Sequence, residues 1–361
     1  MESLGPVFVI LIFFLMRILF QENRGSSAPD DGDLTRQVDA YTAQGNWKLA
    51  EQTLNRLLQK SERRLGPNAI EVGIHLRRLA RVKIGQNNPA AAVSLLLRVL
   101  SIQEANLGLN SPDLLQTLEW IANLPPSPPD MDIAIATTRR VLASCTSLYG
   151  ENSFRLAAAY NILGLLSHSK SEGESALFAF RRAVEVSNDQ IAETNLAVYL
   201  LNLGITLLQQ GGTDEAEPVL RRALSIQEKH PTGDNPNFVS TLIGLGDVLA
   251  KKKDAAAATP YYRRALEILE KKFGPQDPHL IGVLSALATT LAQKQEFTQA
   301  EQFSRRGLDL REKSSPPDSP SVADGLENLA GVLRLSGNLA ESLTLLRRVL
   351  ARFQQFGFPA T

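Results

Sequence analysis

The stretch Ala216-Glu-Pro-Val-Leu-Arg-Arg-Ala-Leu224 recurs along this chain at a fixed spacing. It returns at 258–266 and at 300–308, and its second arginine marks eight positions. Successive marked arginines lie 42 residues apart, except for one interval of 40. A fixed period of this length is typical of a repeat protein in which each repeat packs only on its neighbours. The marked residues are Arg56, Arg98, Arg140, Arg182, Arg222, Arg264, Arg306 and Arg348.

Each repeat contains two apolar periodic stretches, and each stretch has a small residue. The two small residues lie twelve positions apart, as in Gly204 and Ala216, although the first repeat has Val38 at the first position. Glycine often lies between the stretches, and glycine–proline links such as Gly66-Pro67 separate the repeats; both are signals that end helices. The pattern predicts helix, short turn, helix, with the small residues where the two helices cross. The predicted turn glycines are Gly45, Gly211 and Gly337.

The repeat resembles the tetratricopeptide repeat in the long form of kinesin light chains. The resemblance rests on Asn328-Leu329-Ala330, Glu215-Ala216-Glu217, Arg222-Ala223-Leu224 and Gly274-Pro275, and it covers about residues 34 to 354. It implies an all-α, right-handed α-solenoid of about eight helix-turn-helix repeats. Because such arrays bind many unrelated partners, the resemblance indicates a fold and says little about function.

Composition excludes several function classes. The chain has 38 basic and 38 acidic residues, which argues against nucleic acid as a main partner. Cys145 is the only cysteine, so the chain has no intramolecular disulfide, and the four histidines lack metal-ligand spacing. No catalytic constellation or phosphate-binding glycine loop is found. We therefore expect no enzyme activity, no metal and no cofactor.

Residues 4–20 form an apolar run that contains Arg17 near its end. Its length is at the lower limit for a membrane-spanning helix, and Arg17 and Arg24 place the C-terminal side in the cytoplasm. We expect residues 1–22 to be a membrane anchor and 23–33 a flexible linker. The alternative is a signal segment cleaved near Ser26-Ser27-Ala28, which would give a secreted or periplasmic protein.

The resemblance implies that the first helices line an inner groove that binds partners and that the second helices form the outer face. Arg77 and Arg81 share one helix face, so the groove is basic at its N-terminal end and mixed or acidic at its C-terminal end. The alternative, an ordinary hydrated charged surface, stays open. The candidate partner-binding residues are Arg77, Arg81, Glu119, Asn123, Asn202, Asp247, Asp324, Glu327 and Arg334.

Paired arginines such as Arg263-Arg264 lie on second helices, where we expect solvated side chains. The last helix, about 339–353, is apolar, and no ninth repeat follows it. The tail at 355–361 contains Phe356 and Phe358, which either fold back on this helix or leave the end open for self-association or a partner.

Taken together, the sequence predicts a membrane-tethered, non-catalytic scaffold that binds a protein or peptide segment in its groove. Two alternatives are a secreted or periplasmic protein of the same fold and the binding subunit of an enzyme or signalling ATPase complex. The set of lysines, asparagines and arginine by which chaperone-binding relatives hold a terminal carboxylate cannot be placed in this sequence.

Overall fold

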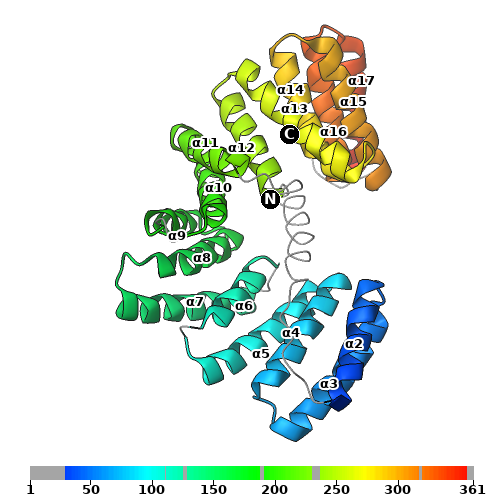
Figure 1. The fold of residues 1–361 in the computed structure, drawn as a ribbon. Coiled ribbons are helices and arrows are strands. Elements are labelled where there is room, and N and C mark those ends of the chain that lie inside the picture. The colour runs from blue at the N-terminus through cyan, green and yellow to red at the C-terminus, as the bar shows by residue number, and fades with distance from the viewer. Residues whose placement is uncertain are drawn as a thin grey trace. The chain divides into compact units, whose positions relative to one another are not determined.

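The structure is a computed structural model that describes residues 29–355, except 110, 125–127, 188–190, 230–235 and 317–318. In this part of the chain all regular structure is helical, with pairs of helices following one another along the chain (Figure 1). The expected all-α repeat fold is therefore confirmed. The predicted anchor at 1–22 and the end of the tail at 356–361 lie outside the described residues.

The chain divides into two compact units, with the boundary between Tyr199 and Leu200 inside one helix. In the N-terminal unit, consecutive helices pack on one another through repeats one to four, and in the C-terminal unit through repeats six to eight. Short 3₁₀ turns at Phe154–Leu156 and Pro278–Leu280 precede two of the first helices. The helices are α2 (Pro29–Ala43), α3 (Trp47–Leu65), α4 (Ile70–Gly85), α5 (Pro89–Leu107), α6 (Pro112–Ala122), α7 (Pro128–Tyr149), α8 (Ala157–Ser169), α9 (Gly173–Glu185), α10 (Glu193–Gln209), α11 (Thr213–Lys229), α12 (Pro236–Lys251), α13 (Ala255–Phe273), α14 (Ile281–Gln293), α15 (Phe297–Ser314), α16 (Pro320–Leu335) and α17 (Leu339–Gln355).

The first helix begins earlier than its apolar pattern indicates. Helix α2 starts at Pro29, whereas the repeat array was expected from residue 34, so α2 includes the end of the predicted flexible linker. Proline is favoured at the first helical position, and the aspartates that follow it are favoured by the positive end of the helix dipole. These polar signals extend the helix where no apolar residue marks it.

Small residues of the first helices lie against large side chains of the second helices. A methyl group added at Gly204 would lie 2.5 Å from Leu220, and one at Gly246 would lie 2.5 Å from the ring of Tyr262. In the last repeat, the hydroxyl of Ser342 donates to the carbonyl of Ala330 at 2.8 Å, which shows that the two small positions do meet. The small residues are therefore needed for the close approach of the two helices.

The turn between the two helices is built in the same way in seven of the eight repeats, whether or not it contains glycine. The turn of repeat three includes 125–127, outside the described residues. At this position Gly45, Gly211 and Gly337 have positive φ, as predicted. Non-glycine residues adopt the same left-handed conformation in four other repeats, which the sequence pattern missed: Asn87, Ser171, Lys253 and Gln295. In each turn the amide of the next residue donates back to the first helix, as Asp254 does to Leu249 at 2.9 Å. This is the helix-ending bond of a Schellman motif.

Arginine–glutamate ion pairs connect successive repeats through their second helices. The second arginine of the repeated pair reaches a glutamate 36 residues earlier, near the end of the preceding second helix. The expectation of solvated side chains was therefore incomplete: Arg98, Arg264 and Arg348 are 40–48% exposed but also pair with the neighbouring helix. The pairs are Arg98–Glu62, Arg140–Glu104, Arg264–Glu228, Arg306–Glu270 and Arg348–Glu312.

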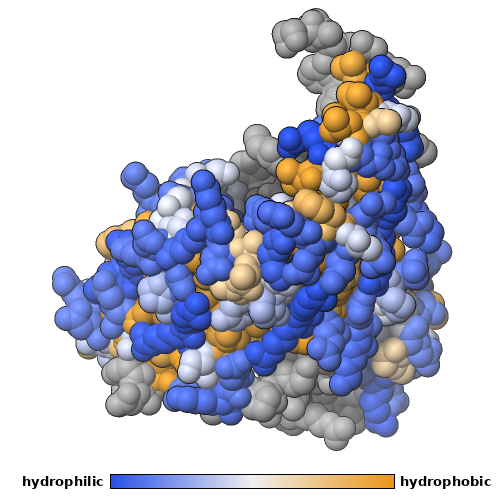
Figure 2. All heavy atoms as spheres, turned by 90° about the horizontal axis from the view of Figure 1, so that it is seen from above, coloured by the Kyte–Doolittle hydropathy of each residue, from blue (hydrophilic) through white to orange (hydrophobic). Residues whose placement is uncertain are grey.

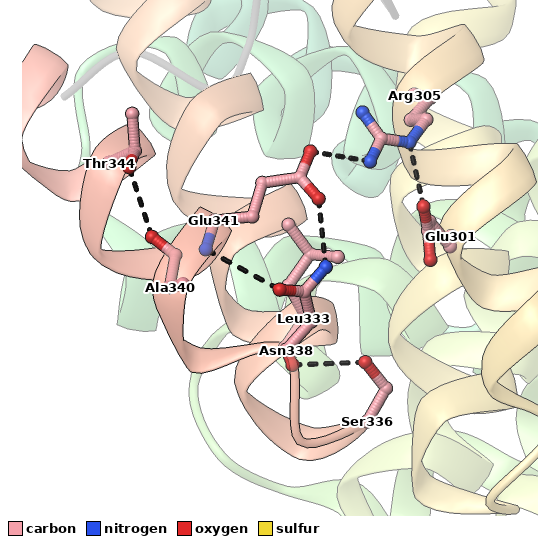
Figure 3. A network of polar contacts seen from close by, with 8 residues as sticks. All are labelled: Glu301, Arg305, Leu333, Ser336, Asn338, Ala340, Glu341 and Thr344. Carbon is pink, nitrogen blue, oxygen red and sulfur yellow. Dashed lines mark hydrogen bonds and ion pairs between the residues drawn. The ribbon is translucent and has the colours of Figure 1, made fainter.

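The first arginine of the pair reaches in the opposite direction in three repeats, and in one of them Arg221 donates to the hydroxyl of Tyr261 at 3.0 Å. Arg305 donates to Glu341 of the next repeat at 2.6 Å and to Glu301 of its own helix at 2.8 Å (Figure 3). Asn338, in the turn before α17, donates to the other carboxylate oxygen of Glu341 at 2.9 Å. Arg263 reaches Gln299 in the same way. The arginine pair thus bridges a second helix to both of its neighbours.

One helix of the described part of the chain, α5, has the length and apolar composition of a membrane span. Its residues Ala92, Leu96 and Leu100 are buried in the core of the N-terminal unit. The apolar character of α5 is therefore explained by packing within the array.

The face of the protein in Figure 2 is largely hydrophilic, with hydrophobic residues showing between polar ones.

Candidate partner-binding surfaces

In the N-terminal unit, the predicted basic residues lie on the first helix of repeat two. Arg77 and Arg81 of α4 are both half-buried. The guanidinium of Arg77 donates to the side-chain oxygen of Gln116 on α6, at 3.1 Å. Arg77 therefore connects two successive first helices and keeps part of its surface accessible.

Glu119 lies one turn after Gln116 on α6. Its side chain keeps accessible surface, but protein surrounds the carboxyl closely enough that loss of hydration raises its pKa. Its charge also acts on Tyr199 of α10: burial, and then the negative charge of Glu119, raise the pKa of Tyr199 to about 12. Glu119 on α6 therefore acts electrostatically on a tyrosine of α10 within this unit.

Asn123, another predicted groove residue, is almost completely buried. Its side-chain amide donates to the carbonyl of Glu119 at 2.8 Å, and its own backbone forms the C-terminal cap of α6. Asn123 thus caps the C-terminal end of α6, and a proline-rich stretch of the sequence follows this helix.

In the C-terminal unit, Asp247 of α12 is paired with a tyrosine of the same repeat. The hydroxyl of Tyr262 donates to its carboxylate at 2.6 Å. Burial raises the pKa of Asp247, while the Tyr262 hydrogen bond and the nearby Lys251 act in the opposite direction. Burial also raises the pKa of Tyr262, which remains a neutral donor.

A half-buried arginine that sequence reasoning did not select lies beside Asp324. Arg311 of α15 donates to Ser285 on α14 at 3.2 Å and to the carbonyl of Ser321 at 2.9 Å. Its nearest carboxylate, that of Asp324 on α16, is 3.9 Å away. Burial lowers the pKa of Arg311, and Asp324 partly offsets this effect.

A signal for Arg311 was present in the repeat register. In all the remaining repeats, the position equivalent to Arg311 holds an uncharged residue, for example Gln103, Gln227 and Leu269. A lone charged residue at a position otherwise neutral could have identified it.

The remaining predicted residues differ in their surroundings. Glu327 and Arg334 of α16 are exposed, and neither forms an ion pair among the described residues. Asn202 of α10 is half-buried and has interactions within the chain. Asn328, which was not selected as a site residue, accepts from Ser304 and donates to a threonine of α14. Arg77 and Glu119 thus share one unit, and Asp247, Asp324 and Glu327 the other.

Nucleophilic and metal-binding groups do not gather in the described segments. No three His, Cys, Asp or Glu side chains there could together hold a metal ion. The thiol of Cys145 is buried, and burial raises its pKa more than Arg155 lowers it. A thiol with a raised pKa is a poor nucleophile, which agrees with a packing role.

The repeat geometry matches a known family. Tetratricopeptide repeat models match residues 34–105, 196–230, 237–313 and 322–355, which together exceed half of the chain. The chain belongs to the tetratricopeptide repeat family. A comparison with curated protein sequences finds no match.

Several solved structures share this fold at low sequence identity. BtubC (BKLC) from P. vanneervenii matches with a TM-score of 0.52 and 17% identity over 64% of this chain and 94% of its own. The apo quorum sensor NprR from B. thuringiensis matches with a TM-score of 0.56 and 13% identity over 89% and 86%. A signal transduction ATPase with a tetratricopeptide repeat sensor, from Pyrococcus horikoshii, matches with a TM-score of 0.58 and 14% identity over 98% of this chain and 53% of its own. At these identities the likeness concerns the fold alone.

Proposed function

We propose that this tetratricopeptide repeat protein is a membrane-tethered scaffold that binds an acidic segment of a partner protein on the first helices of its N-terminal unit. The observation that carries the proposal is the bond between Arg77 and Gln116, which fixes a cationic side chain between two successive first helices. Arg81 lies one turn further along the same face of α4. Two cations held on a ridged helical surface favour an acidic partner segment and steer its approach.

Site-specific photo-crosslinking in native membranes tests this surface. A photoreactive residue at Ile74, which is exposed on α4 one turn before Arg77, should capture a discrete partner protein. The same residue at Arg139, exposed on the second helix α7, should not. Capture of the same proteins from both positions, or from neither, contradicts the proposal. A captured enzyme or ATPase subunit would support the alternative in which the chain is the binding subunit of such a complex.

The tether rests on the apolar run at residues 4–20 and on Arg17 and Arg24. If this run spans the membrane, the intact protein should stay in the membrane fraction after a carbonate wash. A tag at Thr361 should become accessible to protease only after the cytoplasmic side is opened. Release by carbonate, or a mature protein that lacks residues 1–28, would instead favour the secreted or periplasmic alternative.

We also propose that two copies associate through their C-terminal repeats. Four leucines, Leu339, Leu343, Leu346 and Leu350, follow one face of α17, and each is at least 42% exposed. In earlier repeats, the residues equivalent to Leu346 and Leu350 are mostly buried, for example Leu220 and Leu224. The face that a following repeat would cover is therefore apolar and exposed in the described part of the chain.

A second copy fits this face best in a symmetric arrangement. In a head-to-tail arrangement, α2 of one copy would pack on α17 of the other. Helix α16 packs on α15 through a set of positions whose equivalents can be found in α2 from the repeat register. In α2 these positions hold exposed and mostly polar residues: Asp33, Arg36, Gln37 and Ala40. A contact between two identical leucine faces avoids this mismatch and closes after two copies.

Light scattering of the full chain in detergent tests the association. The protein should form a concentration-dependent dimer, Leu343→Glu should abolish it, and Thr344→Glu on an adjacent face should not. A wild-type monomer at all concentrations contradicts the proposal. A dimer that forms only after deletion of residues 356–361 would show that the tail, and not a second copy, covers the leucines.

A further inference from the structure

A cluster of cations lies on the outer face of α3, away from the proposed partner-binding surface. Arg56, Lys60, Arg63 and Arg64, together with Gln59, line a shallow surface recess. Arg56, Lys60 and Arg63 follow the spacing of one helix face, and all the side chains of the recess are exposed. We call these four cations the α3 basic face.

The acidic residues of α3 do not neutralise this face. Glu51 pairs with Lys83 of α4 at 2.5 Å, and the amide of Gln86 donates to its other oxygen, so both bonds lower the pKa of Glu51. Glu62 pairs with Arg98 of α5. Because both carboxylates point toward repeat two, the opposite face of α3 carries only positive charge.

The repeat register explains why Arg56 is available. In five later repeats the equivalent arginine pairs with a glutamate 36 residues earlier. For Arg56 that position is Phe20, which has no charge. Within residues 29–355 as described, neither Arg56 nor Arg63 forms an ion pair.

We propose that the α3 basic face lies on the anionic headgroups of the membrane to which the chain is tethered. The inference rests on the proposed tether at residues 4–20, and its second support is the length of the connection. Six residues, 23–28, separate the predicted anchor from the start of α2, and an extended chain of that length spans roughly 20 Å. Helix α3 packs directly on α2, so the tether keeps the basic face at high effective concentration near the bilayer. This contact would leave the first helices of the N-terminal unit free for a partner.

Fluorescence quenching in nanodiscs tests the contact on the full chain. The only native cysteine is changed by Cys145→Ala, and a fluorophore is attached at Gln59→Cys, inside the recess. Nanodiscs contain phosphatidylcholine alone or with phosphatidylserine, and each contains a lipid that carries a quencher on its headgroup. Quenching should be at least about twofold stronger with phosphatidylserine and should decline at high salt.

Charge reversal separates the basic face from overall charge. Arg56→Glu with Arg63→Glu should abolish the extra quenching, whereas Lys253→Glu with Lys271→Glu, the same change of charge on exposed residues of the C-terminal unit, should preserve it. Equal quenching in the two lipids, with the chain still inserted, overturns the inference and reassigns the face to an acidic protein surface. A chain that does not remain in the nanodisc after a carbonate wash overturns the tether and this inference with it.

Discussion

At the scale of single residues, the packing of the two helices of a repeat depends on positions where there is no space for a larger side chain. Gly246 of α12 and Gly282 of α14 are both helical glycines, but only Gly246 faces a neighbouring ring, that of Tyr262. We expect Gly246→Ala to destabilise the protein by about 1–3 kcal/mol, because the added methyl group overpacks the helix crossing. Gly282→Ala should stabilise it by about 0.5–1 kcal/mol, since no atom lies near the new group and alanine favours a helix.

Denaturant unfolding of the two variants provides this comparison directly. If both substitutions shift the unfolding midpoint in the same direction, the close approach of α12 and α13 at Gly246 is not as described.

Glu119 gives the N-terminal unit a defined pH dependence. Its pKa is raised in the folded protein, so the folded state binds a proton more tightly than the unfolded chain does. This contribution to stability is therefore full below the ordinary carboxyl pKa and is lost as the pH rises through the raised value. Glu119→Gln should gain stability relative to wild type as the pH increases across that range. Urea midpoints measured at several pH values check this, and a constant difference between the two proteins would contradict it.

Residue-scale prediction from the sequence succeeded where a residue type has one physical meaning. Glycine at a turn was read correctly, as for Gly211. Lys253 and Gln295 could not be recognised as turn residues, because neither prefers the left-handed conformation that the array imposes on them. Likewise, the burial of Asn123 depends on how α6 ends, which is a property of the packed structure.

At the scale of helices and turns, one conformation is imposed on different residues. Lys253 has a φ of 64°, which costs a residue with a side chain roughly 1 kcal/mol relative to glycine. We expect Lys253→Gly to stabilise the protein by about 0.5–1 kcal/mol. Gly211→Ala, at the equivalent turn, should destabilise it by a similar amount because alanine disfavours a φ of 83°. Thermal or denaturant unfolding measures both, and a destabilised Lys253→Gly variant would contradict this account of the turn.

The ion pairs between repeats should couple adjacent second helices weakly. Arg306 and Glu270 are both partly exposed, so a double-mutant cycle with alanine should give a coupling of about 0.5–1 kcal/mol that decreases with salt. The pairing could have been predicted from the sequence, since Glu62, Glu104, Glu228, Glu270 and Glu312 share the 42-residue register. The pairing was missed because each helix was considered without its neighbour. A coupling that salt does not weaken would indicate that packing, and not charge, joins the two residues.

At the scale of the whole molecule, the repeat period predicted the fold, the family and the order of the helices. The period could not show that the candidate site residues are divided between two compact units. Nor could it show that Arg311 lies 3.9 Å from the carboxylate of Asp324, because both facts depend on contacts between repeats. The function of the array depends on such contacts, since they fix which side chains remain accessible to a partner.

The most direct test of the proposed scaffold is the affinity of the partner segment captured at Ile74 for two charge-reversed proteins. Calorimetry should show that Arg77→Glu with Arg81→Glu weakens binding by about tenfold or more and flattens its dependence on salt. The melting temperature should change little. Reversal of two outer-face arginines, Arg139→Glu with Arg181→Glu, should leave the affinity within about twofold of wild type. Equal affinity for wild type and the Arg77, Arg81 variant would contradict the assignment of partner binding to the first helices.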